Sequence, residues 1–203
     1  MRYINKIPRK NNEVYDEMVS EGWQFLKEPK SLRQATLISI PISLISAIVS
    51  ILFLISVNGK LSDSISRIFS SNQININIKL SYIILIYLYI LFHEIIHLVF
   101  IPQFIKSKST FISLKWWGGF VYTEEELSKF RFLVITIMPF IMLSFIFPII
   151  LIGIGVSPIL VLILAIINSA GSSVDILNFF LIIVQVPNKG IIKNIGTKTL
   201  FKL

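Results

Sequence analysis

The residues with the clearest capacity for chemistry lie together in the segment His93-Glu94-Ile95-Ile96-His97. On a helix, residues four apart lie on one face a turn apart, so both imidazoles can bind one metal ion. Glu94 would lie beside that face and could accept a proton from a zinc-bound water. His93 and His97 are the only histidines, and the chain has no cysteine. The motif therefore predicts a metal centre with an adjacent general base.

The third metal ligand is expected to be a carboxylate. A catalytic zinc ion commonly has three protein ligands and one open position, and this chain offers no further histidine or cysteine. Apart from Glu94, Asp175 is the only acidic residue inside the long apolar segments, and it shares a helical face with Asn168 and Ser172. The sequence thus predicts Zn²⁺ bound by His93, His97 and Asp175, Glu94 as the catalytic residue, and Asn168 and Ser172 as supporting residues.

Long apolar segments must position these side chains. Hydrophobic residues make up 54% of the chain and charged residues 15%, and residues 34–59 and 132–174 carry no charge at all. A soluble domain of this size cannot bury such segments, so the fold class predicted is an all-α integral membrane protein with about four transmembrane helices. The expected spans are residues 34–56, 80–105, 132–152 and 158–186.

The distribution of Lys and Arg predicts that these spans lie in the cell membrane with both termini in the cytoplasm. All of the 19 Lys and Arg residues except Lys60, Arg67 and Lys79 fall before the first span, between the second and third, or after the fourth. We expect a cytoplasmic N-terminal segment (1–33), a first helix (34–56), a three-helix core (80–186) and a basic cytoplasmic tail (187–203). His93, His97 and Asp175 would lie at one depth, roughly 12–18 Å from the cytoplasmic end.

Two segments outside the spans carry a local signal. Residues 110–122 contain two β-favouring runs separated by Gly118-Gly119, which predicts a short membrane-associated hairpin whose edge could bind an extended substrate. Trp116 and Trp117 could equally form an interfacial aromatic belt. Thr123 and Glu126 have the spacing of a capping box for a helix that continues into the third span.

Other interpretations of the polar residues remain open from the sequence. The cluster could be an interhelical hydrogen-bond network without metal, with Asp175 in a packing seam of small residues. A zinc site could be structural or sensory in a non-enzymatic membrane protein. A metal or proton transporter is less compatible, because the ionisable residues form one cluster rather than a path across the bilayer.

The distribution of charge also bears on the expected partners. A net charge of +8 could indicate a nucleic-acid partner, but the basic residues flank apolar segments, so none is expected. The expected partners are the lipid bilayer and a membrane-protein substrate. The sequence carries no signal for an oligomeric state.

The motif and its setting resemble two groups of known proteins. The H-E-x-x-H in one span with an Asp two spans later is similar to the site-2 protease type of intramembrane metalloprotease, although Ile176 follows Asp175 where those proteases usually have Gly. The closer resemblance is to DUF3267, a family of small bacterial membrane proteins described as zincin peptidases. It is carried by residues 93–97, 138–140 and 168–175 and extends roughly over 80–199. It implies a zinc-dependent intramembrane endopeptidase with the ligands and general base named above.

Overall fold

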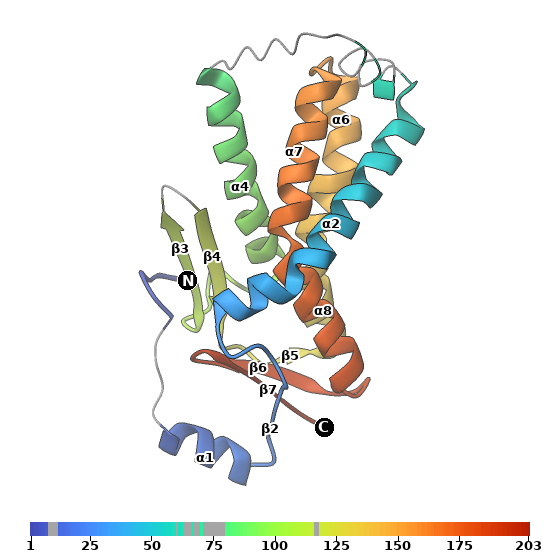
Figure 1. Ribbon diagram of the computed structural model, residues 1–203. Helices are drawn as coiled ribbons and strands as arrows, with labels where there is room; N and C mark the ends of the chain where they lie inside the picture. The colour runs from blue at the N-terminus through green and yellow to red at the C-terminus, as the bar shows by residue number, and fades with distance from the viewer. Residues whose placement is uncertain (8–11, 60, 63–65, 67–69, 71–79, 116–117) are drawn as a thin grey trace.

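The structure is a computed structural model in which residues 1–7, 12–59, 61–62, 66, 70, 80–115 and 118–203 are described. Long helices stand side by side, and the strands and a short helix gather at one end of them (Figure 1). The first two long helices are α2 (Leu32–Val57) and α4 (Leu80–Phe100). They match the first two expected spans, except that α4 ends at Phe100 and the chain turns before residue 105.

The third and fourth expected spans are composite. The third runs from α5 (Lys129–Ile141) through the π-helical segment η1 (Met142–Ile146) into α6 (Phe147–Gly153). The fourth consists of α7 (Pro158–Gly171) and α8 (Ser173–Gln185), which are bent by 46° at their junction. Within the described residues, three helices are long and apolar enough to cross a bilayer, and the bent pair makes a fourth if it counts as one span.

Two small sheets show that the expected all-α class is wrong in one respect. The first sheet has the order β1-β3-β4 and the second β2-β7-β6-β5, so the expected basic tail contains a hairpin. Short strands of this kind form through partners distant in the sequence, which local patterns do not reveal. The strands are β1 (Arg2–Tyr3), β2 (Gln24–Phe25), β3 (Thr110–Lys115), β4 (Gly118–Thr123), β5 (Leu127–Ser128), β6 (Ile191–Ile195) and β7 (Lys198–Lys202), and the short helix is α1 (Asn12–Ser20).

The hairpin predicted over residues 110–122 is confirmed, with one change of detail. Strands β3 and β4 are antiparallel and pair from Thr110↔Thr123 to Lys115↔Gly118. The two glycines, 118 and 119, therefore belong to β4 and not to the turn. Trp116 and Trp117, and with them the predicted aromatic belt, lie outside the described residues.

The predicted capping box is wrong, because its threonine belongs to the sheet. Thr123 ends β4, where its hydroxyl oxygen lies 3.0 Å from that of Thr110. The helix of the third span begins later, at Lys129, and its N-cap is Ser128, whose hydroxyl accepts from the backbone N–H of Arg131 at 3.3 Å. Pairing with β3 thus overrides a local signal for a helix start.

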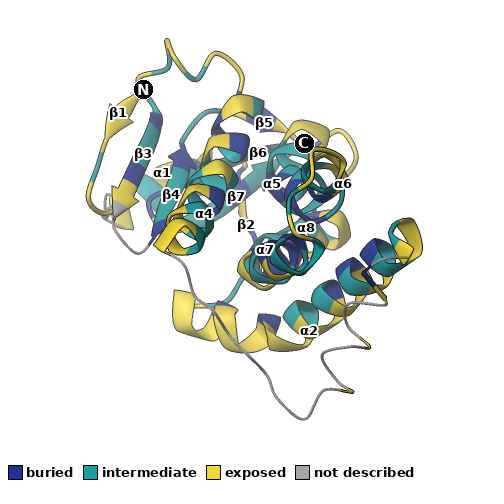
Figure 2. Cartoon of the chain, turned by 90° about the horizontal axis from the view of Figure 1, so that it is seen from above, coloured by how far each residue is buried: buried dark blue, intermediate teal, exposed yellow. Residues whose placement is uncertain are grey.

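Buried residues of the helical part lie where the helices face one another, and exposed residues lie on their outer faces (Figure 2). Many of these exposed residues are large and apolar. One buried cluster consists of Tyr89, Ile96, Leu143 and Leu164, which joins α4, η1 and α7. Helix α2 presents small or polar buried residues to α7 and α8, among them Ser46 and Ser50. Exposed apolar side chains around the rest of the helices are typical of a surface that contacts lipid.

Lys129 fixes the start of the third span to the end of the fourth. Its side chain is buried, and its ammonium donates to the carbonyls of Val186 (2.6 Å) and Ile183 (3.0 Å) at the C-terminal end of α8. A cation at this position satisfies carbonyls that lack helical partners and lies at the negative end of the helix dipole. The contact holds α8, which carries Asp175, against α5.

Candidate metal centre

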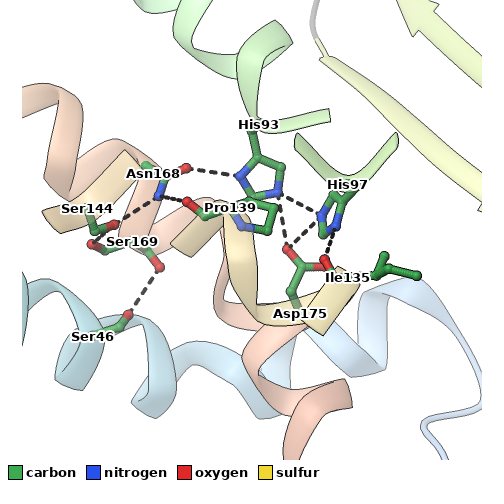
Figure 3. A network of polar contacts seen from close by, with 9 residues as sticks. All are labelled: Ser46, His93, His97, Ile135, Pro139, Ser144, Asn168, Ser169 and Asp175. Atoms are coloured by element: carbon green, nitrogen blue, oxygen red, sulfur yellow. Dashed lines mark hydrogen bonds and ion pairs between the residues drawn. The ribbon is translucent and has the colours of Figure 1, made fainter. Parts of the chain in front are cut away.

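Three of the predicted residues converge between α4 and α8 (Figure 3). The Nε2 atoms of His93 and His97 are 3.2 Å apart, and they lie 3.2 and 3.5 Å from Oδ2 of Asp175. In a tetrahedral site with bonds of about 2.0–2.2 Å, neighbouring ligand atoms lie about 3.3–3.6 Å apart. The spacing of the three atoms therefore fits one bound ion, and the depth argument from the sequence agrees with this convergence.

The protons of both imidazoles are fixed by partners on their other nitrogens. His97 Nδ1 lies 2.8 Å from the carbonyl oxygen of Ile135, which can only accept, so Nδ1 carries the hydrogen. His93 Nδ1 lies 2.9 Å from Oδ1 of Asn168. The amide of Asn168 is oriented in turn, because its Nδ2 donates to the Pro139 carbonyl at 3.2 Å and to Ser144 Oγ at 2.9 Å. Both histidines thus direct an Nε2 lone pair at Asp175.

These tautomers favour a metal ion over a simple hydrogen-bond cluster. Three lone-pair atoms face one another, and neutral imidazoles offer no hydrogen between them. A hydrogen-bonded cluster would need a proton on an Nε2 as well, which would make that ring an imidazolium. A divalent cation satisfies all three atoms at once, and two imidazole nitrogens with one carboxylate oxygen form a ligand set suited to zinc. The residues present therefore fit the zinc ion that the sequence predicts.

A cavity of about 260 Å³ is lined by two of the three ligands, His97 and Asp175. Its other walls include Thr136 of α5, Asn178 of α8, residues 121–123 of β4 and residues 196–199 at the β6–β7 turn. The histidine side chains are 13% exposed and the aspartate 24%, so the centre is shielded but still reachable. The cavity provides room for a ligand next to His97 and Asp175.

Tyr122 lines this cavity at its β4 wall. The side chain is buried, its hydroxyl donates to Glu124 Oε1 at 2.9 Å, and burial raises the pKa of Tyr122 well above its usual range.

Glu94 lies beside the ligands without joining them, and it contacts β4. It is not part of the three-residue metal-binding group, and it accepts a hydrogen bond from the backbone N–H of Val121. Gly119 allows this approach: a Cβ there would lie 2.7 Å from the Ser113 carbonyl oxygen and 3.2 Å from Glu94 Cγ. Only glycine fits such a close contact between backbone and side chain. The sequence pattern places Gly119 in the turn, and no local signal indicates its contact with Glu94.

Asn168 and Ser172, the two predicted supporting residues, have different positions. Asn168 bonds His93 directly, as described above. The hydroxyl of Ser172 is buried without a hydrogen-bond partner among the described residues, at the junction of α7 and α8. The continuous helical face expected from Asn168 to Asp175 is interrupted at this bend, so the structure does not bring the Ser172 side chain into the network.

Serines extend the polar network from the metal centre to α2 (Figure 3). Ser169 Oγ lies 3.1 Å from Ser144 Oγ and 2.7 Å from Ser50 Oγ, and Ser46 donates to the Ser169 carbonyl at 3.1 Å. Through Ser144 and Asn168 these bonds connect α2 to the ring of His93. The first span thus contributes to the support of the site, a role that its sequence alone did not indicate.

Two histidines of a helix-borne H-E-x-x-H, a carboxylate from another helix and the adjacent glutamate form the set of residues that a metal centre of the zincin type requires. The comparison with protein families agrees. The profile of the DUF3267 family, described as "Putative zincin peptidase", matches residues 85–191, more than half of the chain, and the protein belongs to this family. The match includes His93, Glu94, His97 and Asp175. Comparisons with curated proteins and with solved structures give no significant match.

Substitution of Asn168 by leucine is expected to weaken zinc binding about 10–100-fold, the usual effect of losing a hydrogen bond to a ligating histidine. The change removes the acceptor of His93 Nδ1–H, so the ring loses its fixed orientation. Competition with a chelator on the purified protein measures the affinity. Ser172→Ala is the matched control, because that hydroxyl has no partner in the described structure. Equal affinities in the two variants would contradict the assignment.

Proposed function

We propose that this protein is a zinc-dependent intramembrane endopeptidase that hydrolyses peptide bonds of membrane-associated substrates. The observation that carries the proposal is the convergence of two Nε2 lone pairs and a carboxylate oxygen beside Glu94 and a cavity, on helices apolar enough to cross a bilayer. Membership of a zincin peptidase family supports the metallopeptidase class. The intramembrane location and the role of Glu94 are the steps that the proposal adds.

In this mechanism different residues bind the metal, hold the imidazoles in place and transfer the proton. His93, His97 and Asp175 hold the metal, and Asn168 and the Ile135 carbonyl hold the two imidazoles in place. Zinc, when bound, supplies a Lewis acid that polarises the scissile carbonyl and lowers the pKa of water. Glu94 accepts the proton of the attacking water on its carboxylate and returns that proton to the nitrogen of the leaving amine.

Strand β4 is the element suited to bind the substrate chain. Among the described residues it pairs with no strand other than β3, and its residues 121–123 line the cavity beside the metal ligands. At its other edge Glu94 bonds the Val121 N–H and Asn194 bonds the Thr123 carbonyl, so a substrate strand would exchange main-chain bonds for these two side-chain bonds. An extended peptide can add to such an edge through main-chain hydrogen bonds. A peptide bond inside a helix is shielded by its own hydrogen bonds, so we infer that a helical substrate unwinds before it reaches Glu94.

The proposal is tested by mapping protein termini in cells. Cells that produce the wild-type protein are expected to contain new N-termini of membrane proteins, located within or next to the cytoplasmic halves of their spans. Cells that produce His97→Ala at the same level are expected to lack them, because this variant loses a metal ligand. Identical sets of termini in the two strains would count against the peptidase.

We further infer that the cell membrane holds the protein with both termini in the cytoplasm. The N-terminal segment, the loop between α4 and α5 and the C-terminal strands lie at the same end of the helices (Figure 1), and they carry most of the basic residues. Because the chain has no cysteine, single cysteines report topology cleanly. Leu203→Cys should resist an impermeant thiol reagent in intact cells, whereas Ile154→Cys, at the turn between the third and fourth spans, should react. The reverse pattern would invert the topology.

A further inference from the structure

Pro139 leaves a backbone carbonyl beside the metal centre, that of Ile135, without its usual helical hydrogen bond. It lies inside α5, where the N–H of residue 139 would ordinarily donate to the carbonyl of Ile135, four residues earlier. Proline has no N–H, so this helical hydrogen bond cannot form. The Ile135 carbonyl instead accepts from His97 Nδ1 at 2.8 Å. The oxygen that lacks a helical donor in α5 is thus the oxygen that accepts the ring hydrogen of a histidine in α4.

The carbonyl of Pro139 itself serves the other histidine. It accepts from Nδ2 of Asn168 at 3.2 Å, and Oδ1 of the same amide accepts from His93 Nδ1. The π-helical segment η1 begins three residues later, and the backbone N–H of Met142 is shared between the carbonyls of Met138 and Pro139. Such widened turns relax the regular bonding of a helix and often occur at functional sites. Two backbone oxygens of α5 therefore hold the imidazoles: the Ile135 carbonyl bonds the ring of His97, and the Pro139 carbonyl bonds Asn168, which holds the ring of His93.

We propose that Pro139 is a positioning residue of the metal centre. By withholding an N–H from the Ile135 carbonyl, it reserves that oxygen for His97 Nδ1 and so maintains the tautomer that presents His97 Nε2 to the metal. The proposal rests on the zinc site of the proposed function but not on peptide hydrolysis. It assigns to a buried proline a chemical role beyond packing or bending a helix.

Pro139→Ala separates this role from a structural one, because the two roles predict different changes in zinc affinity and in unfolding temperature. Alanine restores the N–H, which then shares the Ile135 oxygen with His97 and weakens the bond to the ring. Zinc affinity should therefore fall, by up to the roughly 10–100-fold that a fully lost hydrogen bond to a ligating histidine costs. Alanine is also the better residue for a helix interior, so the metal-free variant should unfold at the same or a higher temperature than the wild type. A proline needed only for packing would lower stability and leave the affinity of the folded protein unchanged.

The experiment uses the full chain purified in detergent, with zinc affinity from competition with a chelator and unfolding temperature from a thermal scan of the metal-free protein. Pro41→Ala is the control for a proline inside a long helix, since Pro41 lies in α2, but it is exposed and is not part of the metal-binding group. Its zinc affinity should equal that of the wild type. With cobalt in place of zinc, only Pro139→Ala should change the visible absorption spectrum. Wild-type affinity in Pro139→Ala, or loss of its fold, would overturn the proposal.

A measurement on the wild-type protein tests the same inference without a variant. The ¹⁵N chemical shifts of histidine nitrogens distinguish the two neutral tautomers, and metal-free wild type should show His97 protonated at Nδ1. A mixture of tautomers for His97 would show that the Ile135 carbonyl does not fix the ring. Failure to find any cleavage, with these zinc and tautomer results intact, would reject the peptidase and leave the role of Pro139 standing.

Discussion

Glu94→Gln is expected to abolish proteolysis while leaving zinc bound. Glutamine keeps the size of the side chain and can still accept from the Val121 N–H, but it cannot take a proton from water at neutral pH. Loss of a general base lowers rates by about 10²–10⁴-fold, so the termini produced by the wild type should fall below detection. Quantitative mapping of those termini, with zinc content measured on the same purified proteins, checks both halves of the expectation.

Glu126→Gln is the control for this experiment. Glu126 is an exposed acid that pairs with Lys193 at 3.1 Å, away from the metal ligands, and its substitution should leave cleavage unchanged. If Glu94→Gln cleaves as well as the wild type, the general-base role is lost. A structural or sensory zinc site in a non-enzymatic membrane protein would then be the better interpretation, since such a site needs no base.

The metal ligands could be predicted from the sequence because their geometry is mostly local. Residues at i and i+4 share a helix face whatever the rest of the fold does, which fixed the relation of His93 to His97. The prediction of Asp175 as a ligand required one further assumption, namely that ionisable residues at equal depth in apolar spans contact one another. The distances of 3.2 and 3.5 Å to the two histidines agree with that assumption.

The supports of the site were less accessible to sequence analysis. The acceptor for His97 is the backbone carbonyl of Ile135, and a carbonyl has no sequence signature of its own. Pro139 was visible as a motif residue, but its effect depends on which helix packs against α5. A helical pattern continued through Ser172 concealed the 46° bend, because either half alone is a good helix.

The pairing of the strands in the small sheets could not be predicted for the same reason, because it depends on residues that are distant in the sequence. Gln24 of β2 pairs with Phe201 of β7, from the opposite end of the chain, and no local pattern encodes such a partner. The hairpin of β3 and β4 was predictable because its two strands adjoin one another in the sequence. Its contact with Glu94 through Gly119 was not, because it depends on how α4 packs against β4.

The ligand assignment predicts the second large effect. His93→Ala, His97→Ala and Asp175→Ala should each lower zinc affinity more than 100-fold, beyond the range of about 10–100-fold seen when only a supporting hydrogen bond is lost. Each variant removes one of three atoms that lie within 3.5 Å of one another, and two ligands hold zinc poorly. Elemental analysis of zinc after desalting, with Glu94→Gln as the variant that keeps its metal, provides the measurement.

The same three variants are expected to remain folded. Small structural zinc sites contribute about 10–16 kcal/mol to folding, but here the helices are held by backbone hydrogen bonds, by packing around residues such as Leu143 and Leu164, and by the Lys129 contact to α8. Thermal scans should therefore show a modest loss of stability in each variant. Full zinc content in Asp175→Ala would refute the third ligand. Wholesale unfolding of all three alanine variants would mean instead that the metal holds the fold together, because a centre built mainly for catalysis leaves the packed helices intact when it is empty.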